Sequence, residues 1–258
     1  MSKIRKAFDN GKAFIAFITG GDPDIETTEK LLYALYRAGA DIIEIGIPFS
    51  DPVAEGPVIE AADERALQGG CTVEQLFALV ARVRAEIEIP LLFMTYYNPI
   101  FAYGVERFTK ACAQVGIDGL IVPDLPFEER DELLGPCQSQ GLELISLIAP
   151  TSEDRIAKIA QQSDGFLYCV SSLGTTGERD ALDNNARRMI ENAKQVNDIP
   201  CAVGFGISTP EQARAIAQYA DGVIVGSAIV RIAAEHGRGC VEPVYQFAKS
   251  IKQAILKE

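Results

Sequence analysis

Eight short apolar runs recur along this chain, with segments of helical periodicity between them. The runs are rich in Ile, Val and Leu and span residues 13–20, 41–48, 90–96, 118–124, 142–150, 165–171, 199–206 and 221–230. Near-continuous apolar strands that alternate with helices are typical of a parallel sheet covered by helices. Because eight such units close a barrel, the pattern predicts an α/β fold, an eight-stranded parallel (β/α)8 TIM barrel, with a doubly wound open sheet as the alternative.

The junctions between helices and strands also resemble one another. RAGADIIEIG, QVGIDGLIVPD, QQSDGFLYCV and QYADGVIVGS each end a helix and open a strand on an Asp, which is an internal repeat. A length of 258 residues fits two small domains or one such barrel. No linker rich in Ser, Gly or Pro divides the chain, so we expect a single barrel domain over residues 1–258.

No part of the chain indicates a membrane span or a secretion signal. A span needs roughly 18 unbroken apolar residues, and no segment reaches that length. The first residues, MSKIRKAFDNGKAF, are not followed by an apolar stretch with a small-residue cleavage site. We therefore expect a soluble protein of the cytoplasm.

Charge and cysteine usage exclude further classes of protein. The net charge of −12 argues against a nucleic-acid partner, because phosphate backbones select for clustered Lys and Arg. The six cysteines include no CxxC pair, which indicates reduced thiols rather than disulfides or a metal site. A small anionic substrate would have to be bound by backbone N–H groups or by a local feature, against this negative field.

The second apolar run, DIIEIGIP, carries an acidic residue. Strand alternation places Ile43, Ile45 and Ile47 on one face, suited to packing against helices, and Glu44 on the other, toward the barrel interior. Burying an isolated carboxylate costs on the order of several kcal/mol unless it is paired or protonated. A structural Glu bridged to a buried cation is one explanation, but none of the eight runs contains Lys or Arg. We therefore favour a catalytic acid or base.

Two strand ends near the C-terminus indicate a phosphate site. GFGISTPEQA ends the seventh run with Gly204 and Gly206 and opens a helix with an expected capping box at Ser208–Glu211. VGSAIV ends the eighth run with Gly226 and Ser227, where another helix begins. Free N–H groups at helix starts bind anions without lysine, and the last two loops of phosphate-binding barrels carry such sites. Together the two elements favour a phosphate ligand.

Two of the connections that follow strands are long, and both are candidate lids. The interval 48–90 contains most of the stretch GIPFSDPVAEGPVIE and a helix expected near residues 73–87. The interval 171–199 begins SSLGTTGERDALD, which is rich in Gly and Thr. Loops of this kind close over substrates in many enzymes.

Polar and aromatic residues also stand at strand ends. Tyr168 shares a face with Phe166, and Tyr96 ends the third run, so both tyrosines are candidates for the wall of an apolar pocket, although aromatics at such positions are most often core. Asp124 ends the fourth run, where it either faces the mouth of the barrel or caps the following helix.

These motifs together resemble one family, the α subunit of tryptophan synthase. The resemblance covers essentially the whole chain through FITGGDPD, EIGIPFSDPVAEGPVIE, FMTYYNPIF, LIVPDLPFEE, SSLGTTG, GFGIST and VGSAIV, in that order. PFSDP followed shortly by a carboxylate, Gly and Pro is its most specific part. The resemblance implies cleavage of indole-3-glycerol phosphate to indole and glyceraldehyde 3-phosphate in tryptophan biosynthesis. It also implies no cofactor in this chain, and transfer of indole to a pyridoxal-phosphate-dependent β subunit within an α2β2 tetramer.

The resemblance assigns roles to individual residues. Glu44 corresponds to the general acid/base, and Glu55 to the second catalytic carboxylate. Asp51 is expected to contact the other long loop near Thr176 and to help close the lid. Asn98, Pro99 and the segment 123–126 are expected at the β-subunit interface. The remaining assignments are a phosphate site of Gly177, Gly204, Gly206, Gly226 and Ser227, and an indole cleft of Phe14, Tyr96, Ile148 and Tyr168.

Glu55 departs from the family pattern, in which the second carboxylate is an Asp in a stretch reading ADGP. The extra methylene of Glu55 moves the carboxylate by about one C–C bond, and a misplacement of that size can cost catalysis as much as about 100-fold. Either the loop backbone adjusts, or this subunit is slow by itself and depends more on its partner.

Two other functions stay open from the residues. A phosphosugar epimerase or isomerase barrel shares the phosphate site, but it predicts a metal cluster or a catalytic Lys, and the chain has one histidine, His236, and no Lys in the apolar runs. A barrel that binds a phosphosugar or a partner without turnover would not need Glu44 in an apolar interior.

Overall fold

Eight parallel strands form a closed barrel, which confirms the predicted fold and rejects the open sheet. The computed structural model describes residues 2–150, 153–170, 179–204 and 206–256. Each strand pairs with the next along the chain, and the last pairs with the first. The strands are β1 (Ala13–Thr19), β2 (Ile42–Gly46), β3 (Leu91–Met94), β4 (Gly119–Ile121), β5 (Glu143–Ile148), β6 (Leu167–Val170), β7 (Cys201–Gly204) and β8 (Gly222–Val225).

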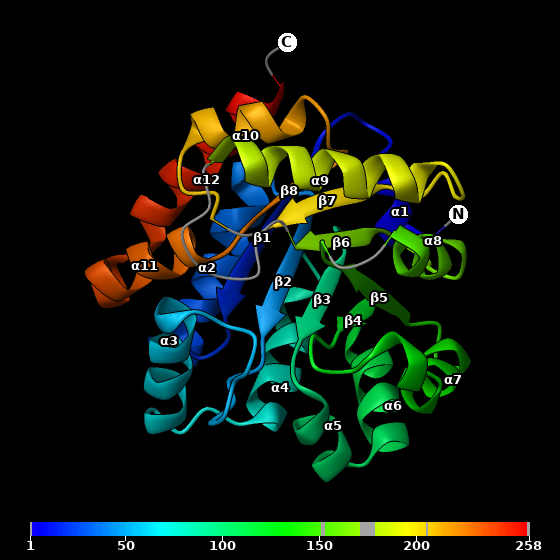
Figure 1. Ribbon diagram of the computed structural model, residues 1–258. Helices are drawn as coiled ribbons and strands as arrows, with labels where there is room; N and C mark the ends of the chain where they lie inside the picture. Colours follow the sequence, from blue (N-terminus) through cyan, green and yellow to red (C-terminus); the bar gives the residue numbers. More distant parts are fainter. Residues whose placement is uncertain (1, 151–152, 171–178, 205, 257–258) are drawn as a thin grey trace.

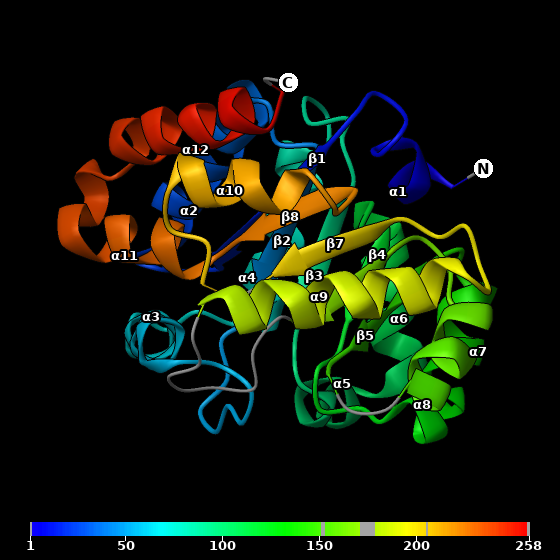
Figure 2. The same cartoon turned by 45° about the horizontal axis from the view of Figure 1, so that its top comes forward.

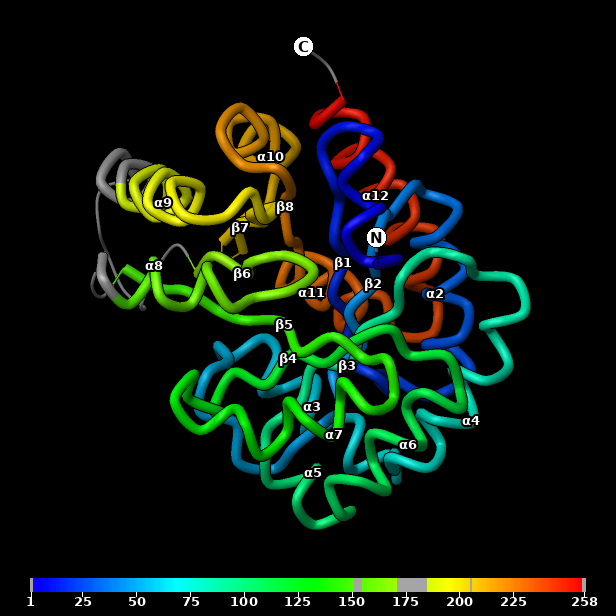
Figure 3. Tube along the Cα trace, turned by 90° about the vertical axis from the view of Figure 1, so that its right-hand side faces the viewer, coloured from blue at the N-terminus to red at the C-terminus, as the bar shows by residue number. Residues whose placement is uncertain are grey.

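Helices surround the strands on the outside (Figures 1 and 2). Contacts between neighbours run in the order α10, α12, α2, α4, α6 and α7, and α8 packs against α9 (Figure 3). The α-helices are α1 (Lys3–Lys6), α2 (Ile25–Ala38), α3 (Pro57–Gln68), α4 (Val73–Val83), α5 (Tyr97–Tyr103), α6 (Val105–Val115), α7 (Asp131–Ser139), α8 (Glu153–Gln161), α9 (Arg179–Lys194), α10 (Pro210–Ala217), α11 (Ser227–His236) and α12 (Val241–Leu256). Two 3₁₀ helices, η1 (Phe127–Glu129) and η2 (Gly237–Gly239), complete the described elements.

Alternation along the strands divides the apolar side chains between two cores. Ile43, Ile45 and Ile47 belong to the core between the barrel and the helices. Ile42 belongs to the second core, inside the barrel, where it lies with Phe166 and Tyr168. Because alternate strand residues point to opposite faces, Glu44 shares the inner face with Ile42, as predicted.

The N-terminal end of the barrel is closed by α1. Ile4 of α1 is 1% exposed and belongs to the inner core. The ring of Phe8 packs on the ring of Phe166, with 5.6 Å between the centroids. The opposite end, where the strands finish, is therefore the open end of the barrel.

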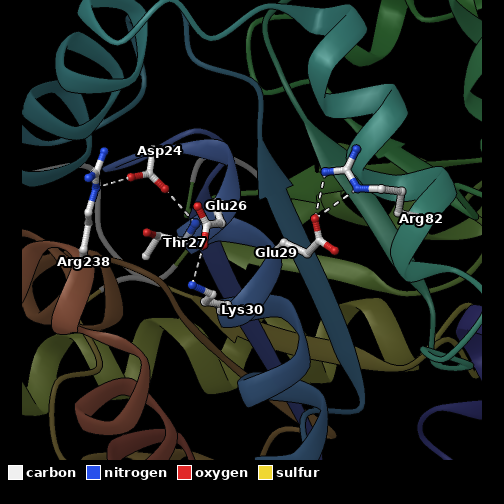
Figure 4. Close-up of polar contacts among 7 residues, drawn as sticks. All are labelled: Asp24, Glu26, Thr27, Glu29, Lys30, Arg82 and Arg238. Atoms are coloured by element: carbon white, nitrogen blue, oxygen red, sulfur yellow. Dashed lines mark hydrogen bonds and ion pairs between the residues drawn. The ribbon is translucent and has the colours of Figure 1, made fainter.

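Polar contacts join the loops and helices near the end of β1 (Figure 4). Asp24 caps α2 by accepting the Thr27 N–H at 2.7 Å, and it also pairs with Arg238 at 2.7 Å. Arg82 of α4 binds Glu29 of α2 at 2.8 Å. Exposed ion pairs of this kind contribute at most about 1 kcal/mol each to the free energy of unfolding. They therefore orient these helices and loops more than they stabilise the fold.

Two details of the helices differ from the sequence predictions. The last four residues of GIPFSDPVAEGPVIE are not loop, because Pro57 begins α3. The capping box of α10 uses Thr209 and Gln212, so the predicted box at Ser208–Glu211 is wrong by one residue. Pro210 explains the shift, since proline is favoured at the first helical position and the cap must precede it.

Within the described residues, no helix is long and apolar enough to cross a membrane. The six cysteines are free thiols, as predicted, and five of them are buried. The same part of the chain contains no group of three His, Cys, Asp or Glu side chains that could hold a metal ion.

Candidate active site

Glu44 is a fully buried carboxyl group without a partner. It lies on β2, in register with Phe17 of β1 and Leu92 of β3. Its side chain is 0% exposed, and neither carboxyl oxygen has a hydrogen-bond partner among the described residues. Burial alone raises the pKa of Glu44 to about 8. The predicted inward orientation is therefore confirmed, and no described cation neutralises this group.

Glu55 is a second carboxyl group of raised pKa, in the loop between β2 and α3. Its Oε2 atom is buried without a hydrogen-bond partner in the described part of the chain. Burial, followed by the negative charge of Asp63, raises the pKa of Glu55 to about 7, although the N–H groups of Ala54 and Glu55 oppose this shift. The two acids therefore differ in environment, as the acid and base groups of an active site do.

Tyr96 supports the loop that carries Glu55. The Ala54 N–H donates a hydrogen bond to the Tyr96 hydroxyl at 2.9 Å. The rings of Phe49 and Tyr96 pack together with 5.3 Å between their centroids. Tyr96 is 3% exposed and acts on the loop, not on the cavity described next.

A cavity of 190 Å³ lies at the open end of the barrel. Glu55 lies on one side of it, and its apolar wall includes Phe17, Ile59, Met94, Tyr168 and Ile224. Burial raises the pKa of the Tyr168 hydroxyl, and the charges of Glu44 and Glu55 raise it further. Tyr168 therefore lies within electrostatic reach of both carboxyl groups. Glu44 is not among the lining residues, but its register partner on β1, Phe17, lines the cavity.

The far side of the cavity is formed by the segments that follow β7 and β8. Gly206, Ser208, Gly226, Ser227 and Arg231 line it. Gly226 precedes α11, and among the described residues no side chain caps the N–H groups of its first turn. Those N–H groups and the positive end of the helix dipole favour an anion, and Arg231 adds a positive charge.

A sequence model of the tryptophan synthase alpha chain family matches residues 3–256. The chain belongs to this family. It is 48% identical to the alpha chain of Lacticaseibacillus casei over 99% of this chain and 96% of that one. It is 45% identical to the alpha chain of Thermoanaerobacter sp. (strain X514), covering 99% and 100% of the two chains.

Solved structures agree with this family assignment. The tryptophan synthase subunit alpha of Legionella pneumophila str. Paris superposes with a TM-score of 0.89 at 38% identity, covering 99% of this chain and 98% of that one. A chain of Mycobacterium tuberculosis tryptophan synthase gives a TM-score of 0.91 at 35% identity, covering 100% and 99%. The chain is thus a carbon–carbon lyase with the alpha-subunit role in tryptophan biosynthesis.

Three of the four residues expected in the indole cleft of this alpha chain, namely Tyr96, Phe14 and Ile148, do not line the cavity. Phe14 is fully buried in the outer core, beneath the helices, whereas Phe17 faces the cavity. Ile148 also packs in the outer core and lines a separate groove of 220 Å³. The predictions for Phe14 and Ile148 are wrong because these residues have the outward phase of their strands. The lining of the separate groove includes no acidic residue, so the chemistry lies in the smaller cavity.

Three of the residues expected to bind the phosphate lie at the cavity, and the others do not line it or lie outside the described residues. Gly206, Gly226 and Ser227 line the cavity, and Gly204 makes room for Tyr168, because a Cβ atom at Gly204 would lie 2.7 Å from the Tyr168 hydroxyl. Asp51 is exposed on its loop and accepts a hydrogen bond from Ser50 Oγ at 2.5 Å. Gly177 and Thr176 lie outside the described residues, so their roles stay predictions.

Asp124 caps a helix, but not the helix that the sequence suggested. Its carboxylate accepts the Tyr97 N–H at 2.9 Å, so it caps α5 and not the helix that follows it. It lies in a turn three residues beyond the end of β4 at Ile121, and it is exposed.

Two residues of the site were missed by sequence reasoning. Arg231 lies four residues after Ser227, one helical turn along α11, and that spacing would have placed it beside the phosphate segment. Asp63 occupies the buried face of α3 between Ala62 and Ala66. An acidic residue on an otherwise apolar helix face was the available signal.

Proposed function

We propose that this alpha chain cleaves indole-3-glycerol phosphate to indole and glyceraldehyde 3-phosphate by a retro-aldol reaction. One observation carries the proposal above all others. Glu44 is a fully buried carboxyl group without a hydrogen-bond partner among the described residues. Its register partner Phe17 lines a cavity that has an apolar wall and an anion-binding side. A protein that only binds a phosphorylated ligand has no use for such a group.

Glu44 supplies the proton transfers. With a pKa of about 8 it carries a proton at neutral pH, so it begins as a general acid that protonates C3 of the indole ring. The resulting Glu44 carboxylate then accepts the proton of the adjacent glycerol hydroxyl as the C–C bond breaks and the aldehyde forms. One proton leaves Glu44 and one returns, so the group is regenerated at the end of the cycle.

Glu55 stabilises the charge that this protonation creates. Protonation of C3 makes the indole ring cationic, and an anionic carboxylate that accepts the ring N–H lowers the energy of that state. The carboxylate form of Glu55 is required for this role, and a pKa of about 7 makes it available at and above neutral pH. The proposed reaction needs ionised Glu55 together with protonated Glu44.

These two requirements predict the pH dependence of catalysis. We expect a bell-shaped profile of kcat/KM, with an acid limb near pH 7 from Glu55 and an alkaline limb near pH 8 from Glu44. The profile is measured by indole release between pH 5.5 and 9.5. A rate independent of pH across this range would contradict both assignments.

The rest of the cavity selects the substrate. Phe17 and Tyr168 offer apolar surfaces to an indole ring, and the first turn of α11 offers N–H groups to the phosphate. Arg231 is the cation among the described lining residues, and it would pair with the phosphate. Family membership also supports the proposed roles of Gly177 in phosphate binding and of Asp51 and Thr176 in closing the lid.

We also propose a tryptophan synthase β subunit as the partner, in an α2β2 assembly in the cytoplasm. Support comes from similar solved structures that are named tryptophan synthase, one of them a complex from Pyrococcus furiosus. Pyridoxal phosphate would belong to the partner, because the acid–base reaction proposed for this chain requires no cofactor. Free thiols fit a reducing compartment.

The deciding experiment measures indole release from indole-3-glycerol phosphate by the purified chain, alone and with a β subunit. Turnover that rises with the partner supports the proposal. Glu44→Gln should abolish cleavage while the affinity for glycerol phosphate is kept, and near-normal turnover by this variant would reject the role of Glu44. Phosphate binding without turnover in the wild-type protein, with or without the partner, would favour a barrel that only binds.

A further inference from the structure

A groove of 220 Å³ beside β5 takes no part in the proposed reaction. It lies between β5, η1 and α8, of which β5 and α8 can be followed in Figure 1. Its described lining shares no residue with the cavity that carries Glu55. An apolar cavity of about 150 Å³ can hold one benzene ring. The groove therefore has room for a ligand with one aromatic ring and a small polar group.

The groove forms where the pairing of β4 with β5 ends. β4 finishes at Ile121, in register with Ile145 of β5. β5 continues to Ile148, and among the described strands its last three residues pair only with β6. The segment that follows β4 does not continue the ladder, and its side of the groove is lined by Val122, Pro123, Leu125, Pro126 and Phe127. The opening is thus a consequence of unequal strand lengths.

The walls of the groove are mainly apolar, and one strand residue adds a hydroxyl group. Leu144 and Ile148 of β5 belong to the outer core, and Ser146 has the same strand phase between them. Ser146 is half-buried and lines the groove. Ile156 and Ile159 of α8 line it from the helix side. The groove therefore offers apolar contacts to the body of a ligand and a hydrogen-bonding group at one point.

The charged residues in the described lining of the groove are two arginines, Arg130 and Arg155. Arg155 is paired with the carboxylate of Glu128 at 3.0 Å. In the described part of the chain, Arg130 contacts neutral groups instead. Its guanidinium lies 4.1 Å from the centre of the Phe127 ring and donates a hydrogen bond to Gln162 Oε1 at 3.1 Å. Arg130 is therefore a positive charge at the groove that no described carboxylate binds directly.

The surroundings of Arg130 compensate its charge only in part. Asp131 and Asp164 are the acids whose charges act on it from a distance. Burial lowers the pKa of Arg130 despite these two charges, so the guanidinium has lost part of its hydration. The contacts with Phe127 and Gln162 hold the planar guanidinium in one orientation. An anion in the groove would replace the lost hydration without a rearrangement of this side chain.

We propose that this groove binds a small apolar carboxylate, with the carboxylate group on Arg130 and the apolar body against the walls from β5 and α8. A guanidinium binds a carboxylate through two parallel hydrogen bonds. The apolar lining favours a monoanion with an apolar body over inorganic phosphate, because one arginine does not compensate a buried phosphate. The groove lies outside the cavity of the proposed reaction, so the inference goes beyond that function and does not depend on it.

The test measures the binding of phenylacetate to the purified full chain. Phenylacetate has one aromatic ring and one carboxylate, and a ligand of this size is expected to bind with a Kd of about 1 mM. Isothermal titration calorimetry measures the affinity, and ¹H–¹⁵N NMR spectra locate the ligand through the amides of Ser146 and Ile156. Phenylacetamide has nearly the same shape without the charge, and it should bind at least about tenfold more weakly.

Three arginine variants complete the design. Arg130→Gln should weaken the binding of phenylacetate by about tenfold, because the charge and the guanidinium are lost. Arg107→Gln is the matched control, since the Arg107 guanidinium lies 4.3 Å from the centre of the Tyr103 ring and does not line the groove. Arg231→Gln removes the cation that lines the other cavity. Both of these variants should bind phenylacetate with the wild-type affinity.

Equal affinities of the wild-type protein for phenylacetate and phenylacetamide would overturn the inference, even if Arg130→Gln failed to fold. Absence of saturable binding at about ten times the expected Kd would overturn it as well. Loss of affinity in Arg231→Gln, with wild-type affinity in Arg130→Gln, would place the ligand in the catalytic cavity and reject the groove. Because none of these measurements needs turnover, their outcome is distinguishable from failure of the proposed reaction.

Discussion

Burial favours the protonated form of Glu44, because no described partner compensates the charge of its carboxylate. Its pKa in the folded chain, about 8, lies above the ordinary value of 4.5. Below pH 4.5 both the folded and the unfolded chain are protonated at this position. Between the two values the unfolded chain releases the proton and the folded chain keeps it, so the free energy of unfolding falls as the pH rises.

This sign predicts the stability of Glu44→Gln. Glutamine does not ionise, so the variant should gain stability relative to the wild-type protein as the pH rises from 5.5 to 7.5. The expected gain is at most about 1.4 kcal/mol per pH unit. Urea unfolding at both pH values measures it, with the exposed Glu64→Gln as the control. A stability difference that stays constant with pH would contradict the raised pKa.

Glu55 tests whether the loop is built for a longer side chain. The bond from the Ala54 N–H to Tyr96 fixes the backbone immediately before Glu55, so the loop cannot advance to compensate for a shorter carboxylate. We therefore expect Glu55→Asp to lower kcat/KM by about tenfold or more, which corresponds to about 1.4 kcal/mol of transition-state stabilisation. Steady-state indole release measures the effect. Equal or higher activity would show that the loop accepts the Asp that is usual in the family.

At the scale of the elements, the positions of the strands were predictable, but the residues of those strands that face the cavity were not all predictable. Eight apolar runs identified eight strands, because strands buried on both faces are near-continuously apolar. The same property concealed which residues of β1 point inward, since AFIAFIT carries no polar residue before its end, and Phe14 was chosen where Phe17 faces the cavity. In β2 the acidic Glu44 marked the inner face. Polar contrast, not periodicity alone, therefore decided which predictions succeeded.

Helix starts show the same limit. Ser208 and Thr209 are adjacent, and each is followed three residues later by a side chain that can close a capping box. Sequence alone gives the two caps similar weight, and the contacts of Gln212 with the Thr209 N–H and Ser208 N–H settle the choice. The burial of Asp63 likewise depends on α3 packing against α11, which no local pattern encodes.

Tyr96 joins β3 to the loop between β2 and α3, and its hydroxyl is the testable part of that connection. Tyr96→Phe keeps the ring contact with Phe49 and removes the acceptor for the Ala54 N–H. We expect the present conformation of the loop to be destabilised by about 1 kcal/mol and kcat to fall by about fivefold, with the fold intact. Activity and circular dichroism together measure this. Unchanged kcat would mean that the hydrogen bond does not position Glu55.

At the scale of the whole molecule, a net charge of −12 surrounds a site that is proposed to bind a phosphate ester. The long-range field repels such a substrate, so local groups must reverse its sign at the cavity. The first turn of α11 and Arg231 are the groups that do so within the described lining of the cavity.

Arg231→Gln should therefore raise KM by about tenfold with kcat nearly unchanged, because the lost contact is made equally in the ground state and the transition state. The loss should be larger at low ionic strength, where the field of the protein is least screened. The exposed Arg238, which pairs with Asp24, provides a matched control as Arg238→Gln. Equal KM values for wild type and Arg231→Gln would place the phosphate elsewhere.

Ile4 closes the barrel beneath β4 and β6, where Cβ atoms at Gly119 and Gly165 would meet its side chain at 3.0 and 3.3 Å. Helix α1 thus covers this end of the barrel, and the cavity lies toward the other end. A product released into the cavity therefore leaves on the side away from α1. A protein bound over the cavity would therefore receive the product that the reaction releases. The packing of Ile4 at one end of the barrel thus determines the end at which the product leaves.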